Sequence, residues 1–509
     1  MSAGSPVPES QQLARKSVYG VLWNYASFGS GKVMVFLTTA ALARLLTPND
    51  FGIVAFATLA VNYLSILKDL GLGVALIQRR ENVEEAANTV FTLNLLLGAV
   101  LTLSGIAIAP LVATFFREPL IVPVLRWLSL TFILNALGSV HIVRLQREME
   151  FRRKLIPDLG HSIFKGIACM GLAWLGAGVW SLVVGQLVGV IAGVILAWAA
   201  FPWRPRLVVN TRLAAGLLGY GMSVVGVNGL AIATDNLDYL IIGRIFGNTD
   251  LGIYTLAFRL PELLVLNPLW VMAAAIFPAY ATIQDQPEIL RRGFLATVRF
   301  VEILCVPLAV GLALVADPLV RVAFGEQWLA AIPIVRILAL FVLVRSIGFN
   351  AGDVYKAIGR PDILVKLEVF NMMILVPALW FGASFGLVGV ACGHLLASLV
   401  RMTADAVIAA RFIRLGLKDI LLQLRPSFLG GVALALGVLP GLYLTADALP
   451  VVRLAVAIPI GAASYLGVLW FLEQASLLRI GRMLGLPGFG KGPVSVSLAL
   501  GSTPDVEAG

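Results

Sequence analysis

Charged residues are scarce in this chain of 509 residues, where they make up 13% of the composition against 59% for apolar residues. Soluble globular proteins carry roughly 25% charged residues. Apolar runs such as residues 90–111 and 451–472 approach the ~20 residues that a helix needs to cross the hydrocarbon core of a bilayer. The composition therefore excludes an ordinary soluble protein and predicts an all-α polytopic membrane protein.

Cysteine and histidine are also rare, with three residues of each. Cys169, Cys305 and Cys392 lie far apart within apolar segments, where a free cysteine behaves as a small hydrophobic side chain. The histidines do not have the spacing of metal ligands. The sequence therefore predicts neither a disulfide framework nor a metal site.

Two further absences narrow the functional classes. Residues 29–32 read Gly-Ser-Gly-Lys, but Ala26 stands where a phosphate-binding loop has its first glycine and Val33 follows the lysine. We therefore expect no ATP site and no cofactor. The longest external loop that we predict comprises only residues 317–330. A membrane glycosyltransferase or ligase would normally need a large external loop with acid and base residues, so an enzyme is not expected.

Apolar segments near membrane-spanning length predict about fourteen transmembrane helices. The positions of the basic residues predict the orientation of these helices in the membrane. Their predicted bounds are residues 17–43, 51–77, 87–113, 122–143, 157–176, 179–201, 213–243, 251–276, 297–316, 331–352, 363–382, 386–410, 427–446 and 450–472. Most Lys and Arg fall in alternate loops, such as 144–154 and 411–425, which the positive-inside rule assigns to the cytoplasm. Both termini are then cytoplasmic, and the net charge of +10 is an orientation signal rather than a nucleic-acid-binding surface.

An internal repeat organises the chain. Residues 44–53 and 244–253 share Arg, Asp, Gly and Ile in identical register, and we call them the first and second copy of the repeated segment. Duplication of membrane-length segments is typical of secondary transporters. We predict a polar segment 1–12, an N-lobe of six helices (13–202), a cytoplasmic linker (203–212), a C-lobe of six helices (213–412), two further helices (413–475) and a cytoplasmic, disordered tail (476–509).

Three segments carry a family resemblance: residues 43–52 (Ala-Arg-Leu-Leu-Thr-Pro-Asn-Asp-Phe-Gly), residues 68–78 (Lys-Asp-Leu-Gly-Leu-Gly-Val-Ala-Leu-Ile-Gln) and residues 277–280 (Phe-Pro-Ala-Tyr). With the six-plus-six helices, they make the chain similar to polysaccharide transporters of the multidrug/oligosaccharidyl-lipid/polysaccharide flippase superfamily. The resemblance implies a V-shaped cavity between the lobes, lined chiefly by helices 1, 2, 7 and 8, and transport by alternating access.

The same resemblance implies a substrate, a polyprenyl-diphosphate-linked oligosaccharide. It would be flipped from the cytoplasmic to the outer leaflet of a bacterial inner membrane for O-antigen, capsule or exopolysaccharide synthesis. The implied partners are membrane lipids, a polysaccharide polymerase and chain-length regulator proteins, with no nucleic acid. A multidrug antiporter and a flippase of another lipid precursor, both of the same superfamily, are the alternatives.

The charges at membrane depth indicate where an anionic substrate would bind, because one charged side chain at the bilayer centre costs ~2.5–3.5 kcal/mol on insertion scales. Lys32 lies midway along the first predicted helix, on about the same face as Asn24, and Lys68 lies on the second. With Arg259, they are the predicted substrate-binding residues. The alternative for Lys32 is a structural pair with an acid of a neighbouring helix.

Three acids are predicted to couple transport to an ion. Asp235 and Asp238 are three residues apart, so we expect them to share a helix face. Either they hold a proton or sodium, or they pair with Arg244 or with the eighth predicted helix near the external surface. Glu262 follows Arg259 by three residues, which predicts either a salt bridge or a phosphate-binding arginine that Glu262 releases. Export of two negative charges is also favoured by an inside-negative potential, by ~2.3 kcal/mol per charge per 100 mV.

Overall fold

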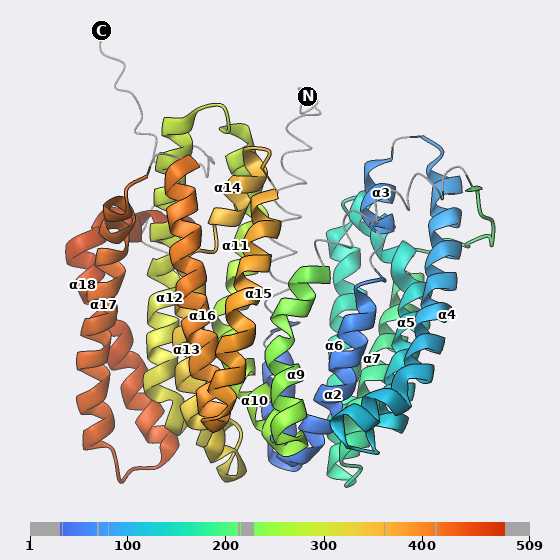
Figure 1. Ribbon diagram of the computed structural model, residues 1–509, viewed down its shortest axis with the longest axis horizontal. Helices are drawn as coiled ribbons and strands as arrows, with labels where there is room; N and C mark the ends of the chain where they lie inside the picture. The colour runs from blue at the N-terminus through green and yellow to red at the C-terminus, as the bar shows by residue number, and fades with distance from the viewer. Residues whose placement is uncertain are drawn as a thin grey trace, which may run out of the picture. The chain divides into compact units, whose positions relative to one another are not determined.

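The computed structural model describes residues 31–32, 34–68, 71–79, 81–211, 214, 229–360, 362–412 and 415–483, and every regular element in those ranges is a helix (Figure 1). The prediction of an all-α fold is therefore confirmed. The chain divides into two compact units, Met1–Gly252 (unit 1) and Ile253–Gly509 (unit 2), and each is described by itself.

Unit 1 is a helical bundle whose first described element is the apolar helix Met34–Leu45. The helices that follow are α2 (Pro48–Ser65), α3 (Leu72–Gln78), α4 (Val83–Phe116), α5 (Ile121–Arg147), α6 (Phe151–Trp174), α7 (Val179–Ala200), α9 (Leu237–Phe246) and the start of α10 (Asn248–Pro261). Helix α4 packs on α5, and α6 packs on α7. A Cβ on Gly185 would lie 2.1 Å from the sulfur of Cys169, so α6 and α7 pack closely because Gly185 has no side chain.

Helix α2 starts where the sequence provides a cap. The hydroxyl of Thr47 accepts a hydrogen bond from the backbone N–H of Asp50 over 3.3 Å, and the Asp50 carboxylate accepts one from the N–H of Thr47 over 2.9 Å. This reciprocal pair satisfies N–H groups that a helix start leaves without partners. Pro48 follows as the first helical residue, where its missing N–H has no cost.

The first copy of the repeated segment packs against residues 244–252 of the second copy, all within unit 1. A Cβ on Gly52 would lie 1.7 Å from the carbonyl oxygen of Asn248, and a Cβ on Gly252 would lie 1.9 Å from the carbonyl oxygen of Pro48. Both distances are far below van der Waals contact, so only glycine permits this approach of two backbones. The Gly that the copies share is therefore the position at which the starts of α2 and α10 touch.

The segment predicted as the linker is fixed along the start of α4. Trp203 is 8% exposed, and its indole N–H donates to the carboxylate of Glu84. The backbone N–H of Arg206 donates to the side-chain oxygen of Asn88 over 2.7 Å. These bonds hold the described part of residues 203–212 against α4, within unit 1.

Unit 2 continues α10 and contains the remaining helices (Figure 1). They are the π-helical turn η1 (Glu262–Leu266), α11 (Asn267–Thr282), α12 (Pro287–Ala323), the 3-10 helix η2 (Glu326–Ala331), α13 (Ile332–Ile347), α14 (Ala351–Ala357), α15 (Asp362–Ala383), α16 (Gly386–Phe412), α17 (Leu417–Leu444) and α18 (Pro450–Met483). Helix α12 packs on α13, α17 and α18, and α15 packs on α16.

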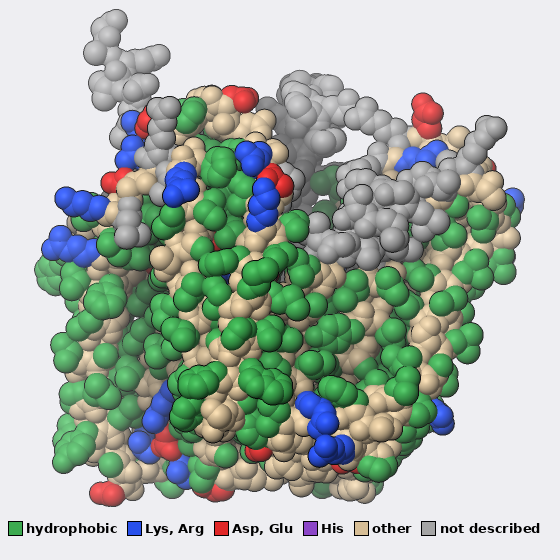
Figure 2. Space-filling model, in the orientation of Figure 1, with side chains coloured by type: hydrophobic (Ala, Val, Ile, Leu, Met, Phe, Trp, Pro, Cys, Tyr) green, Lys and Arg blue, Asp and Glu red, His purple; other side chains and the backbone are tan. Residues whose placement is uncertain are grey.

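Nine helices of the described residues are long and apolar enough to cross a membrane. Figure 2 shows hydrophobic side chains over most of the visible face of unit 2, with Lys, Arg, Asp and Glu gathered mainly toward its two ends. The protein is thus a multi-pass membrane protein. The count of about fourteen spans stays a prediction, because parts of the predicted helices 17–43 and 213–243 lie outside the described residues.

Two predicted helices differ in their details from the structure. The predicted helix 51–77 is interrupted between α2 and α3, where Gly71 has a φ of 65°, a left-handed value outside the α-helical region. The predicted helix 251–276 contains the π-helical turn η1. Pro261 directly precedes that turn and has no N–H to continue the α-helical hydrogen bonds.

Candidate functional site

Polar side chains join helix α2 of unit 1 to the helical residues 229–235 and to Asn236, the residue that directly precedes α9. Asn62 Nδ2 donates to Asn236 Oδ1 over 3.2 Å, and the hydroxyl of Tyr63 donates to the carbonyl of Ala233 over 3.3 Å. Asn236 Nδ2 donates in turn to the carbonyl of Ile232 over 2.8 Å. We call Asn62, Tyr63 and Asn236 the α2–α9 cluster. It connects the second and seventh predicted helices, two of the four that the resemblance assigns to the cavity.

The two predicted ion-coupling aspartates lie beside this cluster in different environments. Asp238, in the first turn of α9, is 1% exposed, and its carboxylate accepts a hydrogen bond from the N–H of Tyr239 over 2.9 Å. Asp235 is exposed. Between them, Asn236 has a φ of −116°, which interrupts the helix. The three-residue spacing predicted a shared helix face, but the interruption separates one buried carboxylate from one exposed carboxylate.

The predicted cationic residues at the start of the chain are only partly described. Asn24 lies outside the described residues. Lys32 is partly buried and takes part in a polar or electrostatic interaction. Lys68 is partly buried in the turn after α2, where its N–H donates to the carbonyl of Ser65 over 3.0 Å. The sequence had predicted Lys68 within the helix 51–77, and this prediction is wrong. Lys68 lies beyond the end of α2.

In unit 2, Arg259 and Glu262 form the predicted salt bridge. Arg259 Nη1 lies 2.9 Å from Glu262 Oε2, and the two side chains are 37% and 32% exposed. Glu262 is the first residue of the π-helical turn, and π-helical turns inside α-helices occur frequently at functional sites. The Arg259 guanidinium is paired but still accessible. An anion could therefore replace the Glu262 carboxylate or bind the guanidinium beside it.

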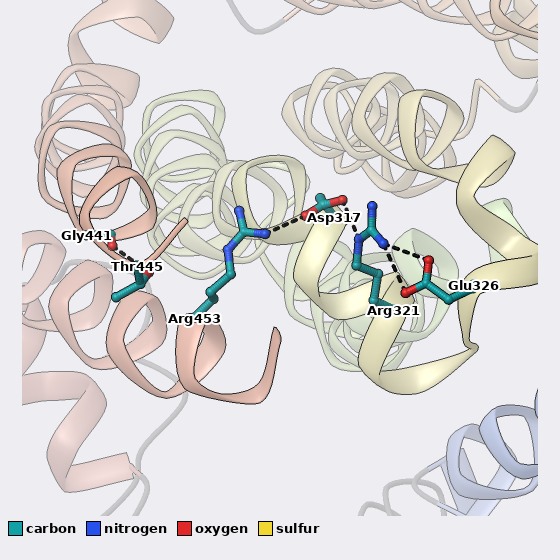
Figure 3. Close-up of polar contacts among 6 residues, drawn as sticks. All are labelled: Asp317, Arg321, Glu326, Gly441, Thr445 and Arg453. Atoms are coloured by element: carbon teal, nitrogen blue, oxygen red, sulfur yellow. Dashed lines mark hydrogen bonds and ion pairs between the residues drawn. The ribbon is translucent and has the colours of Figure 1, made fainter. Parts of the chain in front are cut away.

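A second ion-pair cluster in unit 2 joins α12 to α18 (Figure 3). Asp317 accepts from Arg453 Nη1 over 2.9 Å and from Arg321 Nε over 3.0 Å. Arg321 Nη1 also donates to Glu326 Oε2 over 2.7 Å. We call these four residues the Asp317 cluster. Each charge has an opposite partner, which indicates a structural role that fixes α18 to the bundle.

The arrangement suits binding rather than bond-breaking chemistry. The amides and hydroxyl of the α2–α9 cluster can exchange hydrogen bonds with sugar hydroxyls, and Lys or Arg side chains can bind phosphate. Among the described residues, no group of three His, Cys, Asp or Glu side chains could hold a metal ion.

The sequence analysis missed the α2–α9 cluster. The available signal was the pair Asn62-Tyr63 within an otherwise apolar run, because polar side chains in membrane helices usually hydrogen-bond across to another helix. The partner Asn236 could not have been chosen from spacing, since it lies 174 residues away.

Comparison with known proteins gives a consistent family. Residues 41–333 match the model of a family described as polysaccharide biosynthesis protein. The chain is 26% identical over 482 residues to the teichuronic acid biosynthesis protein TuaB of Bacillus subtilis (strain 168), covering 92% of this chain and 99% of TuaB. It is 26% identical over 385 residues to the succinoglycan biosynthesis transport protein ExoT of Rhizobium meliloti (strain 1021), covering 75% of this chain and 76% of ExoT.

Among solved structures, the lipid II flippase MurJ in an inward closed conformation is similar to this chain. The TM-score is 0.68 with 14% sequence identity, and the alignment covers 90% of this chain and 100% of MurJ. At that identity the likeness establishes the fold alone. The polytopic helical fold expected from the family resemblance is therefore confirmed.

Proposed function

Because this chain belongs to the polysaccharide biosynthesis protein family, we propose that it is a flippase for a polyprenyl-diphosphate-linked oligosaccharide. It moves the substrate from the cytoplasmic to the outer leaflet of a bacterial inner membrane. The family match over residues 41–333 is the observation that carries the proposal. The similarity to TuaB, a teichuronic acid biosynthesis protein, and to ExoT, a succinoglycan biosynthesis transport protein, supports it.

The physics of the substrate supports a transporter with polar groups at depth. Sugar hydroxyls and a diphosphate lose their hydration in hydrocarbon, and unsatisfied polar groups there cost several kcal/mol each. The α2–α9 cluster supplies amide and hydroxyl groups, and Lys32, Lys68 and Arg259 supply positive charge. In the proposed mechanism the saccharide and diphosphate contact these groups while the polyprenyl chain stays in the lipid.

The proposed orientation has both termini in the cytoplasm. Its support is the concentration of Lys and Arg in alternate loops, as in residues 144–154 and 411–425. In this orientation the repeated segments lie on external loops. Polysaccharide polymerase and chain-length regulator proteins are the proposed partners, since they would use the exported saccharide.

The proposed energy source is the membrane potential, with Asp235 and Asp238 as a site for a coupling proton or sodium. Burial of Asp238 supports this role, because a carboxylate removed from water gains most from binding a cation. Replacing both aspartates with Asn should abolish any dependence of transport on pH or sodium. Unchanged transport with unchanged pH and sodium dependence would exclude the ion-coupling role.

A genetic experiment tests the proposed function in the native cell. Deletion of the gene should leave the lipid-linked saccharide on the cytoplasmic leaflet, where an impermeant glycosidase reaches it only in inside-out vesicles. A plasmid copy of the gene should again protect the saccharide from the glycosidase in inside-out vesicles, because the transported saccharide then faces the vesicle interior. Equal protection in vesicles with and without the gene, in a strain with no related transporter, would contradict the proposal.

A further inference from the structure

Glu302 is a buried carboxyl in the interior of unit 2. It lies on α12 and is 1% exposed, and the hydroxyl of Ser346 on α13 donates to its Oε1 over 2.8 Å. Within the described part of the chain, no Lys, Arg or His forms an ion pair with Glu302. As far as the described residues extend, the side chain is therefore held by one neutral hydrogen bond and by no cation.

Glu302 differs in this respect from the other acids that the described residues bury in unit 2. Those acids pair with cations: Asp353 with Lys356 at 3.2 Å, Asp405 with Arg401 at 3.5 Å, and Glu473 with Arg299 at 2.5 Å. Removing a carboxylate from water costs several kcal/mol unless a cation and hydrogen bonds compensate it. Burial of Glu302 thus needs a different explanation from burial of the others.

The groups around Glu302 do not supply the missing charge. Cys305 on α12 and Tyr465 on α18 interact with Glu302 electrostatically. A thiol and a phenol are weak acids, so neither side chain can carry a positive charge. Arg299, nearly one turn earlier on α12, is engaged by Glu473. Arg345 precedes Ser346 on α13, and successive residues of a helix point in different directions. Arg345 has an interaction of its own.

A row of buried polar side chains leads away from Ser346. Asn350 and Asp353 follow Ser346 by four and seven residues, the spacing of side chains on one face of a helix. The turn of residues 348–350 separates α13 from α14, and Gly348 and Asn350 in this turn keep right-handed backbone angles. Asn350 is 0% exposed, and neither Oδ1 nor Nδ2 has a hydrogen-bond partner among the described residues. Asp353 pairs with Lys356, whose side chain is 49% exposed.

We propose that Glu302 is a proton-binding site and that Ser346, Asn350 and Asp353 line the route by which protons reach it from the Lys356 end. A bound proton neutralises the carboxyl, for which the described residues supply no cation. A metal cation would need several oxygen ligands, whereas Ser346 is the hydrogen-bonding neighbour that the described residues provide. The amide of Asn350, which has a free donor and a free acceptor, suits the transfer of a proton through one or two water molecules.

Infrared difference spectroscopy on the purified full chain tests the proposal without substrate, so its result does not depend on the proposed function. The wild-type protein should show the carbonyl stretch of a protonated carboxylic acid that decreases as pH rises, and Glu302→Gln should remove this band. The substitution keeps the shape of the side chain and its hydrogen bond to Ser346. Glu473→Gln, which changes a buried acid paired with Arg299, is the matched control and should leave the band unchanged.

The route is tested by the rate at which this band shifts in heavy water. Asn350→Leu removes two unpartnered polar atoms, so the fold should tolerate it, and it should slow the exchange by about tenfold. An unchanged exchange rate would overturn the assigned route. The proton site itself is overturned if Glu302→Gln leaves the band intact, or if sodium at constant pH removes the band from the wild-type protein.

Discussion

The backbone of Asn248 lies so close to Gly52 that a Cβ on Gly52 would be 1.7 Å from the Asn248 carbonyl oxygen. Each residue belongs to one copy of the repeated segment, so the repeat that is visible in the sequence has a packing explanation. The shared glycine permits the contact, and the Thr47 cap fixes the start of α2 beside it. The repeated segment is therefore a structural junction, and the transport chemistry is proposed to lie elsewhere on the helices that it connects.

Gly52→Ala should destabilise the purified protein. The added methyl group would overlap the Asn248 carbonyl, and overpacking of this kind typically costs ~1–3 kcal/mol. Thermal unfolding in detergent, followed by intrinsic fluorescence, measures the shift. The matched control is Gly171→Ala on α6, where a Cβ would meet no atom within 4 Å. Alanine there should be neutral or stabilising, and equal melting temperatures for the two variants would contradict the account of the junction.

Asp317→Asn should also destabilise the protein, because it removes the acceptor charge shared by Arg321 and Arg453. The side chains of Asp317 and Arg453 are 21% and 20% exposed, and a lost hydrogen bond to a charged group costs about 1.5–3 kcal/mol. Glu326→Gln changes a side chain that is 70% exposed, where a pair contributes ~0–1 kcal/mol. Denaturant unfolding should rank the two variants in that order, and the reverse order would show that α18 is not fixed by Asp317.

The stability of the protein should depend on pH through Asp250. This residue precedes the predicted span 251–276, and burial raises the pKa of its carboxyl above the ordinary value. A raised pKa means that the folded state favours the protonated form, so the contribution of Asp250 is fully present below the ordinary pKa and lost as pH rises through the raised one. The stability of the wild type relative to Asp250→Asn should therefore fall with rising pH across that window. If the stabilities of the two proteins changed in parallel with pH, Asp250 would not be the source of the pH dependence.

Arg259→Gln should weaken binding of a diphosphate lipid by about tenfold, the equivalent of ~1.4 kcal/mol. Glu262→Gln should instead strengthen it, because the guanidinium loses the carboxylate that competes with phosphate. Binding to nanodiscs that contain a polyprenyl diphosphate measures both effects. Arg360→Gln is the control, since that arginine pairs with Asp362 in an exposed turn. If all three variants bind alike, Arg259 has no part in recognition.

The sequence predicted the features that depend on composition and local spacing. The apolar runs predicted the helices, and the three-residue spacing of Arg259 and Glu262 predicted their ion pair, which is present at 2.9 Å. The sequence did not predict the backbone interruptions at Gly71, which has a left-handed φ, and at Asn236. Both residues lie in segments whose composition predicts a continuous helix. The break at Asn236 is what separates the environments of Asp235 and Asp238.

Contacts between distant segments could not be predicted from one sequence. Asn62 and Asn236 are 174 residues apart, and Glu302 and Ser346 are 44 residues apart. Glu302 was not a predicted site residue, because a single acid in a long helix looks the same whether it pairs with an arginine or stands without a cation. Packing in three dimensions decides between those cases.

Reconstituted flipping tests the central claim most directly. The purified protein is placed in liposomes that contain a fluorescent polyprenyl-diphosphate oligosaccharide, and an impermeant quencher reports the fraction left in the outer leaflet. The account predicts that the protein exchanges the labelled lipid between leaflets and that an imposed potential biases the final distribution, by ~2.3 kcal/mol per charge per 100 mV. Exchange no faster than in empty liposomes, with the protein shown to be folded, would contradict it.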